Sequence, residues 1–135
     1  MPYDASALAA RLLLSAVFLP NGLLKLSDLQ GTAGYFESLG FPSPFAVAVA
    51  TALFELLGGL AIVTGFNTRI VALLLAAFCI AAGTIGHLGQ GGDDAAMAFM
   101  HLQVFLKDIG LAGGFLALAL AGAGRFSLDG AASPK

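Results

Sequence analysis

The sequence predicts an all-α integral membrane protein, a polytopic four-helix bundle that takes up nearly the whole chain. Two observations lead to this prediction. Of 135 residues, 59% are hydrophobic and only 10% are charged, with a mean hydropathy of +0.92, whereas about a quarter of the residues in a soluble domain are charged. In addition, four stretches reach the roughly 20 mostly apolar residues that a membrane-crossing helix requires.

The four expected spans follow one another along a single domain. They cover residues of about 7–27, 45–65, 69–88 and 103–122. The first stretch is interpreted as a helix and not as a signal peptide, because it has no basic leader and no clear cleavage site of small residues. We therefore expect one transmembrane domain over residues 1–126 and a short polar tail over 127–135.

The basic residues near the span ends predict an orientation in the membrane. Four spans place four basic residues on one side and at most two on the other: Arg11, Arg69, Arg125 and Lys135 against Lys25 and Lys107. Basic residues favour the cytoplasmic side. We therefore expect both termini in the cytoplasm, in the inner (plasma) membrane of a bacterium.

Composition also excludes some classes of function and partner. The net charge of −2, without any basic stripe, excludes a nucleic-acid partner, and the lipid bilayer is the expected environment. A single cysteine, Cys79, excludes an intrachain disulfide and a dithiol redox centre made by this chain alone.

The segment "PNGLLK" interrupts the first apolar stretch with residues that lipid disfavours. Pro20 removes a helical hydrogen bond, and Gly22 lets another backbone approach closely. Asn21 and Lys25 lie four residues apart and therefore share one face of the helix. The segment is expected to form one wall of a polar pocket.

Glu55 is the acidic residue that lies deepest in a span, near the middle of the bilayer. A charge there costs at least about 2.5–3.5 kcal/mol, so we predict that Glu55 pairs with Lys25, Lys107 or Arg11. The expected pocket lies in the outer half of the bundle and comprises Asn21, Lys25, Glu55, His87, Lys107 and Asp108. Simpler alternatives remain for four of these residues and for Arg11. Lys25 snorkels to the headgroups, Lys107 and Asp108 form an interfacial pair, and Glu55 belongs to a purely structural ion pair. Arg11 only sets topology or snorkels.

The remaining motifs favour structure over chemistry. The paired glycines Gly58–Gly59 and Gly113–Gly114 are expected to permit tight helix contacts or, less often, dimerisation. Met97, Met100 and His101 have helical spacing and could suit copper. Such a spacing more often marks the apolar face of an interfacial helix, so no metal site is predicted, and haem ligation by His87 and His101 is also not expected.

Three segments of the chain resemble the DoxX family of small four-helix membrane proteins. They are "RLLLSAVFLPNGLLKLSDLQGTAGYFESLGFPSP", "FELLGGLAIVTGFNTR" and "FLKDIGLAGGFLALALAGAGRFSLD". The resemblance marks Arg11, Gly22, Lys25, Glu55, Gly58, Arg69 and Lys107. One departure is Asp108, where the family more often has Asn. The family name resembles that of a thiosulfate:quinone oxidoreductase subunit, and the resemblance implies an association of some relatives with membrane oxidoreductase complexes.

These observations lead to one preferred function and two alternatives. We expect a redox-associated membrane subunit whose polar pocket takes a quinone or lipid-like ligand. No motif for an electron carrier and no identifiable catalytic residue is present, so catalysis would need a bound cofactor, such as a quinone, or a redox partner protein. The alternatives are a component of a small transporter or channel, working as a homo-oligomer, and an assembly factor for a membrane partner.

Overall fold

The computed structural model describes residues 2–132, and every regular element in that range is a helix. The elements are α1 (Pro2–Ser27), α2 (Leu29–Ser38), α3 (Pro44–Thr64), α4 (Thr68–Gly86), α5 (Ala95–Ala121) and α6 (Leu128–Ala132). Four of them, α1, α3, α4 and α5, are long and apolar enough to cross a membrane. The predicted fold class is confirmed, while the orientation of the termini stays a prediction.

The helices extend beyond the apolar stretches that predicted them. α1 begins at Pro2 and α5 at Ala95, each several residues before the expected start of its span. The carboxylate of Asp94 accepts hydrogen bonds from the first backbone N–H groups of α5, and Asp28 caps α2 in the same way. Hydropathy does not register such caps, and the four expected spans accordingly leave out α2 and the first turns of α1 and α5.

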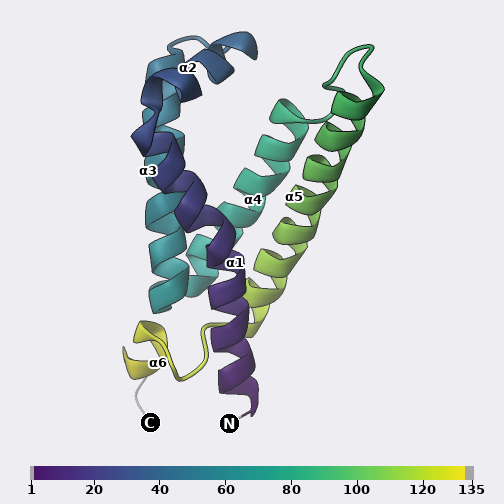
Figure 1. Ribbon diagram of the computed structural model, residues 1–135. Helices are drawn as coiled ribbons and strands as arrows, with labels where there is room; N and C mark the ends of the chain where they lie inside the picture. The colour runs from purple at the N-terminus through teal and green to yellow at the C-terminus, as the bar shows by residue number, and fades with distance from the viewer. Residues whose placement is uncertain (1, 133–135) are drawn as a thin grey trace.

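The long helices form two pairs that diverge toward one end of the molecule. α1 packs along α3, and α4 packs along α5 (Figure 1). The pairs meet at the end that carries α6 and the start of α1, and they separate toward the end that carries α2 (Figure 1). The two pairs therefore pack against each other at one end of the molecule and diverge at the other.

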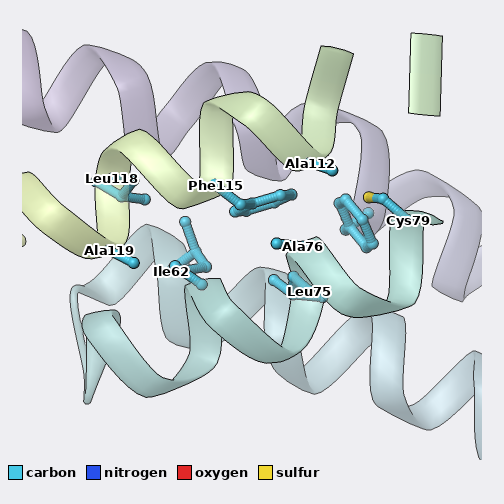
Figure 2. Packing of buried hydrophobic residues seen from close by; sticks show 10 residues of the cluster. Ile62, Leu75, Ala76, Cys79, Ala112, Phe115, Leu118 and Ala119 are labelled. Atoms are coloured by element: carbon cyan, nitrogen blue, oxygen red, sulfur yellow. The ribbon is translucent and has the colours of Figure 1, made fainter. Parts of the chain in front are cut away.

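The hydrophobic core lies where the two pairs meet. Figure 2 shows Ile62, Leu75 and Phe115 at its centre, and all three are completely buried. The ring of Phe18 meets the ring of Phe115 edge to face, with centroids 5.3 Å apart, a favourable arrangement for aromatic pairs. Because α1, α3, α4 and α5 all contribute to this cluster, it fixes the crossing of the two pairs.

Glycines permit the closest helix contacts, although not at every position expected from the sequence. A Cβ on Gly22 would lie 2.8 Å from the backbone nitrogen of Leu56, so α1 and α3 touch backbone to backbone there. Gly58, Gly59 and Gly114 face the side chains of neighbouring helices. Gly113 is exposed, and no atom of the described residues lies within 4 Å of where its Cβ would be. The packing role expected for Gly113 is therefore absent from this chain's own fold.

Arg11 is buried and does not snorkel, so that interpretation of the sequence was wrong. Its side chain is 1% exposed. Its guanidinium donates to the carbonyls of Ile62 and Val63 at the C-terminal end of α3, at 3.0 and 2.7 Å. It also donates to the carbonyls of Ala123 and Phe126 beyond α5, at 2.8 and 2.9 Å. The charge is thus stabilised by carbonyls at the C-terminal end of α3 and in the segment between α5 and α6.

The segment expected to be a polar tail is part of the fold as far as residue 132. Asp129 of α6 accepts hydrogen bonds from the backbone N–H groups of Asn67 and Thr68, at 2.7 and 2.8 Å. It thereby caps α4, whose own N-cap residue makes no side-chain cap. Arg69, expected to be structural, donates to the carbonyl of Ala119 at 3.3 Å. Residues 133–135, including Lys135, lie outside the described residues.

Gly22→Ala should destabilise the protein, because the added methyl group would meet backbone atoms of α3 that cannot rotate away. We expect a loss of about 1–3 kcal/mol, the usual cost of overpacking, seen as a lower melting temperature in detergent. Gly113→Ala is the matched control in a helical position with free space, and it should be neutral or slightly stabilising. Equal melting temperatures for the two variants would contradict the close contact at Gly22.

Asp129→Ala should destabilise the protein at neutral pH by about 1 kcal/mol, the typical value of a helix cap. Burial alone would raise the pKa of Asp129, but the N–H groups of Thr68 and Asn67 and the charge of Arg11 outweigh it, so the pKa lies below its ordinary value. A carboxyl of this kind stabilises the fold above its unfolded pKa of about 3.9 and stops doing so as the pH falls through the lower folded value.

The melting difference between wild type and Asp129→Ala should therefore be constant from pH 7 to 5 and shrink below about pH 4. Asp93→Ala, at an exposed loop position, is the control and should leave the melting temperature unchanged. A difference that persists at the lowest pH would show that the charged carboxylate is not what caps α4.

Candidate functional site

A cavity of about 410 Å³ lies between the two helix pairs, and α1, α2, α3, α4 and α5 all contribute to its lining. Most of the wall is apolar and includes Phe18, Phe36, Phe78 and Leu111. The polar groups that line it are Asn21, Lys25, Tyr35, Thr51, Glu55, His87 and Asp108. A mostly apolar wall with a few convergent polar groups is typical of small-molecule sites.

The central polar feature of the cavity is an ion pair between α1 and α3. Nζ of Lys25 lies 2.7 Å from Oε2 of Glu55, and the side chains are 27% and 8% exposed. Of the three partners expected for Glu55, the structure selects Lys25. Glu55 lies about 15 Å from either end of α3, since a helix rises 1.5 Å per residue, so the pair is near the middle of the span.

The backbone contact at Gly22 sets the position of this ion pair. Gly22 touches Leu56, the residue after Glu55. Lys25 lies three residues after Gly22, close to one turn further along the same face of α1. The close approach of the two helices at Gly22 therefore brings the ammonium of Lys25 within reach of the carboxylate of Glu55.

Asp108 brings a second carboxyl group into the cavity from α5. It packs against Gly83 of α4, where a Cβ would lie 3.0 Å from the Cβ of Asp108. Lys25 can compensate just one of the two carboxylates that line this cavity. The second carboxyl group therefore leaves the site suited to a bound molecule that donates a hydrogen bond.

Tyr35 and His87 close the cavity on the α2 side. The hydroxyl of Tyr35 donates to the carbonyl of Gly86 at 3.1 Å and so ties α2 to the end of α4. Burial, together with the charge of Asp108, raises the pKa of Tyr35, which keeps the hydroxyl protonated. Burial and the neighbouring His101 lower the pKa of His87, which favours its neutral ring.

Five of the six residues expected in the pocket line this cavity, namely Asn21, Lys25, Glu55, His87 and Asp108. Lys107 is exposed and does not line it, so including it was wrong. Successive residues of a helix point about 100° apart, and Asp108 occupies the inward direction. The pocket expected from the sequence did not include Tyr35 or Thr51, although Thr51 precedes Glu55 by four residues and shares its face.

Comparison with known proteins agrees with this architecture. The model of the DoxX family matches residues 6–88. Two relatives from Escherichia coli K12 are the inner membrane protein YqjF, 35% identical over 126 residues (93% of this chain, 91% of the relative), and the inner membrane protein YphA, 34% identical over 124 residues (90% and 86%).

A third relative matches a smaller part of the chain. It comes from Bacillus subtilis 168, is named "Putative oxidoreductase CatD", and is 35% identical over 80 residues, which are 59% of this chain and 58% of the relative. No solved structure matches the chain. The family match, the two relatives of nearly equal length and the four membrane-crossing helices agree. The chain belongs to the DoxX family and is a multi-pass inner-membrane protein.

Proposed function

We propose that the protein is a redox-associated membrane subunit that binds the headgroup of a quinone, or a similar lipid-like carbonyl compound, beside Lys25 and Glu55. The observation that supports this most is the mostly apolar cavity of about 410 Å³ with an ion pair in its wall at mid-membrane depth. Its volume lies in the range of about 300–1,000 Å³ that is usual for small-molecule sites.

The residues of the cavity suit the chemistry of a quinone. The ammonium of Lys25 carries three donor hydrogens, of which Glu55 takes one, so a donor remains for a quinone carbonyl. The amide of Asn21 offers another donor on the same face of α1. The rings of Phe18, Phe36 and Phe78 provide apolar surface for the headgroup.

The carboxyl groups would serve proton transfer in this proposal. Reduction of a quinone to a quinol consumes two electrons and two protons. Glu55 and Asp108 would each take up a proton from water and pass it to one of the two oxygens. With a single cysteine and no electron-carrier motif in its sequence, the chain would receive the electrons from the redox centre of a partner protein. The name of the relative CatD supports a redox role.

The packing favours a pocket over the alternative of a transport path. The cluster around Phe18, Leu75 and Phe115 fills the space between the helix pairs beyond the cavity. A path across the bilayer would have to pass through these buried side chains. Two further alternatives to a quinone-binding subunit are a homo-oligomeric transporter component and an assembly factor. The binding experiment described next tests the quinone proposal against both.

A quinone analogue titrated into the purified protein in lipid nanodiscs should bind saturably. Glu55→Gln and Lys25→Met should each weaken this binding about tenfold or more, since loss of a charged hydrogen bond costs about 1.5–3 kcal/mol. Lys107→Met is the matched control, a lysine of α5 that points away from the cavity, and should bind like the wild type. Absence of saturable binding, or equal effects of all three substitutions, would refute the proposal.

Stability measurements on the same variants test the ion pair itself. Lys25→Met leaves a carboxylate that is 8% exposed without its partner, whereas Glu55→Gln leaves an ammonium that is 27% exposed. Lys25→Met should therefore destabilise more, by up to about 3–5 kcal/mol. The double variant should be more stable than Lys25→Met alone, because no uncompensated charge remains, and additive losses in thermal melts would contradict this coupling.

A further inference from the structure

The two histidines of the chain meet at the rim of the cavity, between α4 and α5. His87 ends α4 and His101 lies in the second turn of α5. Their Nδ1 atoms are 2.9 Å apart, and the ring centroids are 5.2 Å apart. A direct hydrogen bond requires that one Nδ1 carries a proton and the other does not. Two potential ligand atoms therefore converge on one point.

This separation fits two ligands of one metal ion. Imidazole nitrogens bind first-row transition metals at about 2.0–2.1 Å. Two nitrogens 2.9 Å apart then subtend an angle of roughly 90° at the metal, and an opening of a few tenths of an ångström gives the tetrahedral angle. A metal ion in place of the shared proton thus requires little movement.

Met97 offers a third ligand of a different kind. It precedes His101 by four residues, so both side chains project from the same face of α5, and its side chain is 42% exposed and therefore accessible. No group of three or more His, Cys, Asp or Glu residues in the described chain could hold a metal. The available set of two imidazoles and one thioether suits copper better than it suits zinc or a hard cation.

Hydrogen bonds and close packing fix the backbone near both histidines. The backbone N–H of His87 donates to the carbonyl of Gly83 at 3.1 Å. Tyr35 holds the carbonyl of Gly86, immediately before His87, at 3.1 Å. At α5, the loop packs tightly onto the first turn, because a Cβ on Gly91 would meet the backbone of Ala98. Such preorganisation lowers the conformational entropy lost on binding.

We propose that His87, His101 and Met97 form a binding site for a single cuprous ion at the rim of the cavity. The site goes beyond the proposed quinone function and does not depend on it. It uses every histidine of the chain, which makes a clean spectroscopic test possible.

The test uses full-length protein carrying a purification tag without histidine. Cu⁺ is titrated under reducing conditions in competition with a chromophoric chelator. Wild type should bind one ion, and His87→Ala and His101→Ala should each weaken binding by about tenfold or more, at least as much as the loss of a supporting residue around a metal. Met97→Leu should weaken it less, and Met100→Leu should leave it unchanged.

Two further controls keep the outcome decisive. Cys79 carries the one thiol of the chain and is buried in the core, and Cys79→Ala should leave the stoichiometry at one. His101→Gln keeps a polar side chain on α5, so loss of copper binding in this variant at an unchanged melting temperature separates ligation from folding. X-ray absorption should report two nitrogens and one sulfur around the metal.

Several results would overturn the proposal. They are the absence of copper binding, binding that survives removal of both histidines, and tighter binding of Zn²⁺ than of Cu⁺. In each case the pair would act only as a hydrogen bond between α4 and α5. The quinone titration is performed without copper, so its result and this one are independent.

Discussion

The need to compensate charge inside the bilayer governs the architecture of this protein. Glu55 would be costly alone in the middle of its span, and it forms an ion pair of 2.7 Å with Lys25 in the last turn of α1. The pair requires α1 and α3 to lie in close contact, which Gly22 permits by touching the backbone of Leu56. The contact of α1 with α3 leaves α4 and α5 to form the second pair, and the cavity lies where the two pairs diverge.

Arg11 and Lys25 show how the same constraint leads to two different roles on one helix. Arg11 donates to four carbonyl groups and is 1% exposed, so the fold uses four of its five donor hydrogens. Lys25 makes one hydrogen bond, to Glu55, and borders the cavity. An ammonium that borders a cavity and has unused donor hydrogens can bind a ligand. A guanidinium whose donors mostly bond backbone carbonyls instead holds segments of the fold together. This difference, and not depth in the membrane, distinguishes the structural charge from the candidate functional one.

The sequence was sufficient for the helices but not for the directions of individual side chains. Hydropathy identified the four spans, because their apolar composition is a property of each segment alone. The exposure of Lys107 depends on the rotation of α5, and the burial of Arg11 depends on carbonyls some 50 and 110 residues away along the chain. The cap that Asp129 forms on α4 likewise joins distant segments. Neither hydropathy nor spacing within one helix contains such information.

His87 links the two proposed sites, because it lines the cavity and also contacts His101. A ligand in the cavity and a metal on the histidine pair would therefore share one side chain. Any change that one of them makes in the position of this ring alters the affinity for the other, and thermodynamic linkage requires the effect to be reciprocal. Tyr35 extends the connection to α2 through the carbonyl of Gly86. Under these two proposals the diverging end of the bundle would act as one coupled unit, while Arg11 and α6 join the helices at the opposite end.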